Sequence, residues 1–245
     1  MILAGNWKLN KGPTEAKAFA EKFLKMANGS LKAKTIIFPT ALSLATLSEV
    51  FKDSEASFGL QNMALEPSGA FTGENSGEMS KALGAKYVLI GHSERRALYK
   101  ESNETVNKKV KAAIGLDLVP MICIGETLAD RKEEKTNEVL KTQLKEALLG
   151  CSFKVAPVIA YEPVWAIGTG EVATPEQANN AHQFIKNLVK DLLPEEVSVR
   201  TAVLYGGSVK PTNAESLSEM DFIDGFLVGG ASLKVDSFIG IGEFC

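Results

Sequence analysis

The sequence predicts an α/β protein in which residues 1–245 form one domain, built as a (β/α)8 barrel. Short apolar segments alternate with segments of helical periodicity, which is typical of parallel βαβ units. The apolar segments show little polar alternation, as expected of parallel strands whose two faces are both buried. Eight units of ~30 residues fit the chain length, and no linker or shift in composition divides it. A doubly wound open sheet is the alternative, although no GxGxxG motif follows the first apolar segment.

The predicted strands are apolar runs that end where glycine, proline or polar residues begin. Pro39 stops the second run and Pro163 follows the sixth, because proline lacks the backbone donor that strand pairing needs. Glycine and polar residues end the others. The predicted strands are residues 2–4, 35–38, 56–60, 87–90, 118–124, 155–161, 202–205 and 226–228.

Helices are predicted between the strands, where apolar residues recur at three- and four-residue spacing. The first such stripe ends before Gly29, a typical helix stop. Thr174 precedes the clearest stripe as a cap, with a proline next and a glutamine three residues later. The best predicted helices are residues 14–27, 41–50, 127–149 and 175–192.

Composition argues against several classes of function. A net charge of −3 offers no general attraction for nucleic acid or anionic membranes. No apolar run is long enough to span a bilayer, and the first apolar stretch is too short for a signal peptide. Cys123, Cys151 and Cys245 lie far apart without CxxC spacing, which favours free thiols in a reducing cytosol. With only two histidines, a histidine-based metal site is not expected.

Residues 155–174 combine a predicted strand, a carboxylate and a loop of small residues. Glu162 follows the strand directly, and Pro163 comes next. The loop after them is interrupted by glycines, and loops of this length between strand and helix are often functional. This order predicts a base beneath a mobile lid. An ordinary strand–helix connection with a surface glutamate is the alternative, and the rest of the chain decides between the two.

Polar residues after the first and fourth strands are candidates for the same site, because the carboxyl ends of barrel strands form one face. Lys8 could attract an anionic substrate and stabilise negative charge on oxygen, and Asn6 could orient it. His92 precedes a predicted helix start, where the helix dipole disfavours imidazolium, so a neutral ring could donate to a carbonyl. Glu94 could hold Lys8. Surface, turn and capping roles are the alternatives for these residues.

Small residues after the last two strands predict a phosphate site. Ser208 lies in the segment YGGSV, and Gly229 and Gly230 follow the eighth strand. Glycines permit close approach of the backbone to a ligand, and successive N–H groups form an anion-binding nest. Loops after strands seven and eight are the usual phosphate site of barrel enzymes. Simple turn formation is the alternative.

Two further groups of residues have predicted roles outside the main cluster. The glycine-rich loop 69–74 places Phe71 at its tip, which predicts an interface element, with a self-packed Ω-loop as the alternative. Cys123 is expected to be buried as a small hydrophobic residue. Glu126, Arg131 and Lys135 are expected to be solvated charges on a helix face.

Seven motifs together resemble the triosephosphate isomerase family, from the first strand to the last helix. Their order and spacing match the family, and the motifs around His92 and Glu162 are the most specific. They are GNWK at 5–8, GAFTGE at 69–74, IGHSERR at 90–96, CIGE at 123–126, AYEPVWAIGTG at 160–170, YGGSV at 205–209 and VGGAS at 228–232.

The resemblance implies an isomerase of glycolysis and gluconeogenesis that interconverts dihydroxyacetone phosphate and D-glyceraldehyde 3-phosphate through an enediolate. It implies that Glu162 is the general base and His92 a neutral electrophile that polarises the carbonyl. Lys8 and Asn6 would lie beside the substrate oxygens, and Glu94 would be a supporting carboxylate.

The same resemblance implies a lid at residues 163–172 and a cytoplasmic homodimer in which the loop carrying Thr72 reaches into the partner's active site. Triose phosphate is the expected small-molecule partner, with neither a metal nor an organic cofactor. Backbone N–H groups of four residues would bind the phosphate: Gly168, Ser208, Gly229 and Gly230.

The sequence departs from the family pattern at three places. Residues 171–173 are Glu-Val-Ala where Lys-Thr-Ala is common, Thr40 stands where a second proline is usual, and Ala202 stands where arginine is frequent. These positions bear on lid motion and stability rather than on the reaction. One alternative is another sugar-phosphate barrel enzyme, which would need a metal or a different acid–base pair. The other is a catalytically dead phosphate-binding barrel, which would have lost Glu162, His92 or Lys8, and all three are present.

Overall fold

The computed structural model describes residues 1–27, 31–167 and 171–245, and its eight parallel strands form a closed barrel in sequence order. β8 pairs with β1 and leaves no free edge, so the predicted (β/α)8 barrel is confirmed and the open sheet is wrong. The strands are β1 Ile2–Asn6, β2 Lys34–Phe38, β3 Ser57–Leu60, β4 Tyr87–Ile90, β5 Val119–Ile124, β6 Val158–Tyr161, β7 Ala202–Tyr205 and β8 Gly225–Val228.

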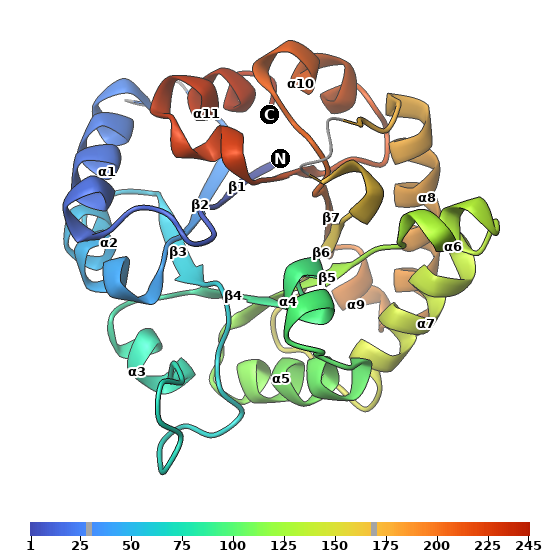
Figure 1. Cartoon of the computed structure of the whole chain (residues 1–245), viewed down its shortest axis with the longest axis horizontal. Coiled ribbons are helices and arrows are strands. Elements are labelled where there is room, and N and C mark those ends of the chain that lie inside the picture. The colour runs from blue at the N-terminus through green and yellow to red at the C-terminus, as the bar shows by residue number, and fades with distance from the viewer. Residues whose placement is uncertain (28–30, 168–170) are drawn as a thin grey trace.

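Helices surround the barrel as an outer ring (Figure 1). None of those in the described ranges is both long and apolar enough to cross a membrane. The α-helices are α1 Pro13–Ala27, α2 Leu44–Phe51, α3 Gly77–Ala82, α4 Ser93–Leu98, α5 Asn103–Gly115, α6 Leu128–Lys132, α7 Thr136–Leu148, α8 Pro175–Leu192, α9 Glu195–Ser198, α10 Pro211–Ser218 and α11 Val235–Gly242. Three short 3-10 turns accompany them: η1 Ala41–Ser43, η2 Val164–Ala166 and η3 Gly230–Leu233.

Several element boundaries differ from the predictions for local reasons. The helix predicted over 127–149 is two helices, α6 and α7, because Glu134 between them has a φ of 57°, which a continuous helix cannot accommodate. The predicted helix over 41–50 divides into η1 and α2. β6 starts at Val158 rather than at residue 155, since Val155 is 55% exposed. β1 runs on to Asn6, which pairs with Phe38 of β2.

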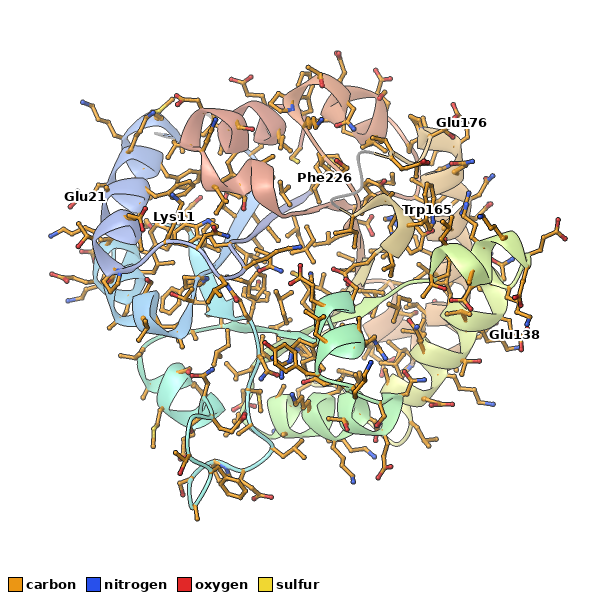
Figure 2. All side chains as sticks on the ribbon, in the orientation of Figure 1. Lys11, Glu21, Glu138, Trp165, Glu176 and Phe226 are labelled. Atoms are coloured by element: carbon orange, nitrogen blue, oxygen red, sulfur yellow. The ribbon has the colours of Figure 1, made fainter. Side chains whose placement is uncertain are left out.

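The strands bury both of their faces, as their apolar runs predict. Successive residues point to opposite sides of a strand, so Leu3 packs outward toward the helices and Ala4 packs inside the barrel. In Figure 2, Phe226 lies within the ring of helices, whereas Glu21 and Glu138 point outward. The inner core consists of Ala4, Ile36, Phe38, Tyr87, Leu89, Met121, Cys123, Val158, Ala160, Leu204 and Leu227. The predicted burial of Cys123 is therefore confirmed.

His182 of α8 is a fully buried histidine outside the barrel wall. Its ring centroid lies 5.8 Å from that of Tyr161 and 6.2 Å from that of Tyr205. The Nδ1 atom lies 3.2 Å from the carbonyl oxygen of Phe222, which makes Nδ1 the protonated nitrogen of a neutral ring. Burial lowers the pKa of His182 from 6.5 to about 3.

We predict that His182 makes the fold less stable as the pH falls from 6.5 toward about 3. In that range the unfolded chain binds a proton that the folded ring does not, which costs about 1.4 kcal/mol of unfolding free energy per pH unit. His182→Gln should remove this component of the slope, measured by urea unfolding at a series of pH values. Gln183→His, at an exposed position of the same helix, is the control and should leave the slope unchanged. Equal slopes for His182→Gln and the unmodified protein would contradict the prediction.

Candidate active site

A cavity of about 430 Å³ opens at the carboxyl ends of the strands, on one face of the barrel. It brings together most of the residues that the sequence singled out. An adjoining cavity of about 420 Å³ shares Lys8 and His92 with it and adds Glu94. Gly168 lies outside the described residues, and Thr72 lies in the loop between β3 and α3, which extends away from the barrel in Figure 1. The predicted residues that line the first cavity are Asn6, Lys8, His92, Glu162, Ser208, Gly229 and Gly230.

Glu162 is the buried carboxylate of this cavity, with 2% of its surface exposed. Its Oε1 atom lies 2.9 Å from Nε2 of His92, and its Oε2 accepts the backbone N–H of Ser93 at 2.8 Å. Burial would raise the pKa of Glu162, but His92, the Ser93 N–H and Lys8 together bring it below its ordinary value. The carboxyl group is therefore ionised near neutral pH and able to accept a proton.

His92 is the N-cap of α4 and presents a defined tautomer to the cavity. Its Nδ1 accepts the backbone N–H of Glu94 at 3.2 Å, so the proton of the neutral ring lies on Nε2 and points at Glu162. Burial lowers the pKa of His92, whereas the charges of Glu162 and Glu94 raise it, with a net shift upward. The charge of the ring thus depends on where the Glu162 carboxylate lies.

Lys8 is the cation at the mouth of both cavities, and its position is fixed on several sides. Its Nζ lies 2.5 Å from Oε1 of Glu94, and its backbone N–H donates to Oδ1 of Asn6 at 3.0 Å. Gln61 donates from Nε2 to the Lys8 carbonyl at 2.8 Å. Lys8 has a φ of 51°, a conformation that is uncommon for a lysine and that often occurs at functional sites.

The opposite wall of the cavity is made of small residues. The segment after β8 turns back through η3, with the Ser232 hydroxyl donating to the Gly229 carbonyl at 2.7 Å. A Cβ atom on Gly229 would lie 3.5 Å from the Lys8 side chain, an ordinary van der Waals distance, so the two residues are neighbours in the cavity. Lys210 also lines the cavity and was not predicted, although it follows the YGGSV segment directly in the sequence.

Glu126 is a buried acceptor rather than the solvated charge that the sequence predicted. It is 0% exposed, and its Oε1 accepts the Tyr161 hydroxyl at 3.1 Å and the indole N–H of Trp165 at 2.9 Å. Arg131 pairs with the same oxygen at 3.2 Å, and its guanidinium carbon lies 4.4 Å from the centroid of the Trp165 ring. Trp165 is labelled in Figure 2. The prediction of a solvated Glu126 is wrong because this residue lies against the chain that follows β6. Lys135 is exposed, as expected. The available signal was the position of Glu126 two residues after the end of β5, close to the strand end as Glu162 is.

We predict that Glu126→Leu lowers the free energy of unfolding by about 2–4 kcal/mol, because the buried Tyr161 hydroxyl then loses its acceptor and Arg131 its carboxylate partner. Urea unfolding measures the loss. In a Trp7→Phe background, Trp165 is the single tryptophan, and its emission should shift to the red as the ring becomes hydrated. Glu126→Gln keeps an acceptor oxygen and should lose less than half as much. A Glu126→Leu variant of undiminished stability would contradict the prediction.

Within the ranges that the structure describes, no three or more His, Cys, Asp and Glu side chains are grouped as metal ligands. The expectation that the protein uses neither a metal nor an organic cofactor stays a prediction.

Comparison with known proteins gives full-length similarity to one family. The family model of triosephosphate isomerase matches residues 1–245. The triosephosphate isomerase of Bdellovibrio bacteriovorus is 49% identical over 97% of this chain and 96% of that protein. Those of Geobacter metallireducens and Caldanaerobacter subterraneus subsp. tengcongensis are 46% and 45% identical, over 97% and 98% of this chain and 95% and 97% of their own lengths.

Proposed function

Since the chain belongs to the triosephosphate isomerase family and interconverts dihydroxyacetone phosphate and D-glyceraldehyde 3-phosphate, we propose that Glu162 is the base that moves the proton between the two carbons. The observation that carries this proposal is the Glu162 carboxylate itself. It is buried and ionised, and it faces a cavity that also contains a cation and an imidazole N–H. A base of this kind must lie within hydrogen-bond reach of the carbon acid in the bound substrate.

His92 supports the reaction as a neutral hydrogen-bond donor. Its Nε2–H points into the cavity, and the Glu94 N–H on Nδ1 opposes a second proton on the ring. When Glu162 turns from His92 toward a substrate carbon, the contact that raises the histidine pKa is lost, and burial then favours the neutral ring. A neutral imidazole in this role is known for the triosephosphate isomerase family.

Lys8 and Asn6 stabilise the negative charge that an enediolate places on oxygen. Fixed donors and cations stabilise developing charge most where water is excluded. Lys8 is anchored through Glu94, Asn6 and Gln61, so the cation is positioned before the substrate arrives. In this role Glu94 acts through Lys8, which it holds in place.

The phosphate group occupies the wall formed by Ser208, Gly229 and Gly230, with Gly168 joining from the lid, and Lys210 adds a second cation on that side. Residues 163–172 form the lid. Because the phosphate is remote from the reacting carbons, its binding energy can drive closure without affecting the proton transfer directly. Closure keeps water from the intermediate.

The chain acts as one domain, in the cytoplasm and as a homodimer, without a metal or an organic cofactor. Exposed apolar side chains support the dimer: Phe71 is 49% exposed in the loop that carries Thr72, and Leu98 and Tyr99 are 72% and 67% exposed beside the 420 Å³ cavity. Burying such surfaces drives association. In the dimer the loop around Thr72 enters that cavity on the partner, next to Lys8.

A coupled isomerase assay on D-glyceraldehyde 3-phosphate tests the catalytic roles. Glu162→Asp keeps the charge but withdraws the carboxylate by about 1 Å, so kcat should fall about 100-fold or more. The inhibition constant of inorganic phosphate should change little, because the phosphate wall is untouched. Glu176→Asp, an exposed carboxylate of α8, is the matched control. An equal loss of turnover and of phosphate affinity would count against Glu162 as the base.

The assembly is tested by placing a charge at the loop tip. Phe71→Asp should make the protein monomeric in sedimentation velocity and lower its activity more than tenfold, because the cavity that the loop fills adjoins Lys8 and His92. Val199→Asp, at an apolar residue that is 71% exposed away from this cavity, is the control and should change neither. A fully active monomer would refute the proposed completion of the site by the partner.

A further inference from the structure

The backbone of Glu162 lies in a strand pairing that continues beyond the ends of β5 and β6. Tyr161, the last residue of β6, pairs with Ile124, the last of β5. The pairing then goes on, because the Glu162 N–H donates to the Ile124 carbonyl at 2.8 Å and the Val164 N–H donates to the Glu126 carbonyl at 3.1 Å. In this register Gly125 is the residue opposite Glu162.

Gly125 lies so close to the backbone of Glu162 that a larger residue would not fit there. A Cβ atom at position 125 would lie 1.7 Å from the Glu162 carbonyl oxygen and 2.6 Å from its carbonyl carbon. Any shift of the Gly125 peptide toward β6 therefore displaces the Glu162 backbone as well. On the other flank, the Gly206 N–H donates to the Tyr161 carbonyl at 2.7 Å, which fixes the opposite side of the same segment.

The polar groups of Gly125 itself face away from Glu162, toward the position that a β4 residue would occupy in a longer sheet. β4 ends at Ile90, which pairs with Ile122, so no β4 residue lies opposite Gly125. Gln143 of α7 takes that place. Its Oε1 accepts the Gly125 N–H at 2.8 Å, and its Nε2 donates to the Gly125 carbonyl at 3.1 Å.

The backbone of Gln143 is held firmly, because α7 packs against the core through the residues beside it. The next residue of α7, Leu144, and Leu140 one turn before it are both fully buried in the core between the helices and the barrel. A cavity of about 240 Å³ is lined by Gln143, Gly125 and Glu162 together. It provides room for the Gly125 peptide to shift, so close packing alone does not fix the peptide.

We propose that Gln143 is a positioning residue for the general base: by binding both polar groups of Gly125, it sets the place of the Glu162 backbone and hence of its carboxylate. The inference rests on the proposed role of Glu162 as the base. The Glu162 backbone is the point from which the side chain reaches the substrate, and a displacement of 1 Å can cost about 100-fold in rate. Gln143 itself does not reach the cavity that binds the substrate.

The test compares Gln143→Met, which keeps the shape of the side chain and removes both hydrogen bonds, with Gln143→Glu, which keeps only the acceptor for the Gly125 N–H. We expect kcat to fall about tenfold for Gln143→Met and less for Gln143→Glu, with KM changed less than about twofold. The primary deuterium isotope effect at the substrate carbon should grow, since proton transfer is the step that is slowed. Gln183→Met, the same change at an exposed site on α8, should be silent.

If Gln143 had only a structural role, Gln143→Met would lower the thermal stability and leave kcat of the folded protein unchanged. Such a result would overturn the proposal. Gln143→Glu provides the same measurement if Gln143→Met does not fold. Non-additivity is the second readout. If Gln143 acts through Glu162, the Gln143→Met substitution should cost less than about threefold in a Glu162→Asp background, and a full tenfold loss there would also overturn it.

The two proposals fail in different ways. A Glu162→Gln enzyme that retains its turnover would remove Glu162 from the chemistry, and the positioning inference would fall with it. If Glu162→Gln is inactive while Gln143→Met turns over like the unmodified enzyme, the base stands and only the role of Gln143 is refuted.

Discussion

Parallel pairing of β1 with β8 joins the two ends of the chain, with Leu3 opposite Phe226 and Gly5 opposite Val228. This pairing closes the barrel, and closure turns eight separate strand ends into one rim. Asn6 from the first strand and Gly229 after the last can line one cavity only because of it. Closure also leaves no free strand edge, so the hydrogen-bonding groups of the backbone are satisfied around the whole ring.

Charge within the rim is arranged as two linked pairs. Glu162 contacts His92 in the buried part, and Lys8 contacts Glu94 where the cavity opens. A buried carboxylate stays ionised only when donors surround it, and the Ser93 N–H and the His92 ring supply those donors. The Glu162 carboxylate is therefore ready to accept a proton, and its present partner, His92, is the residue proposed to polarise the substrate carbonyl.

Around these pairs lies a layer of polar groups that bind the chain next to Glu162. Glu126 gathers three donors, from the end of β6, from η2 and from α6. Gln143 replaces a missing strand partner for Gly125. Both contact the chain just beyond the ends of β5 and β6, where the proposed lid begins. Precise placement of Glu162 is thus a property of β5, β6 and α7 together.

Much of the fold was predictable because its signals are local. Apolar runs ended by glycine, proline or polar residues marked all eight strands, and the Thr174 cap marked the start of α8. The strand ends also predicted which residues gather, since in a parallel barrel every carboxyl end lies on one face. Asn6, Lys8, His92 and Glu162 followed from that rule, before any distance was known.

Only the tertiary structure decided the environment of each side chain. Glu126 and Glu162 each follow a strand, yet one is bound to an indole and a phenol and the other to an imidazole, because different helices and loops pack against them. In the sequence, nothing distinguishes Gln143 from the other polar residues of its helix. Its two hydrogen bonds to Gly125 exist only because α7 lies beside β5. Sequence fixes periodicity and end signals, which are local, whereas burial, pKa shifts and hydrogen-bond partners arise from residues that are distant in the chain.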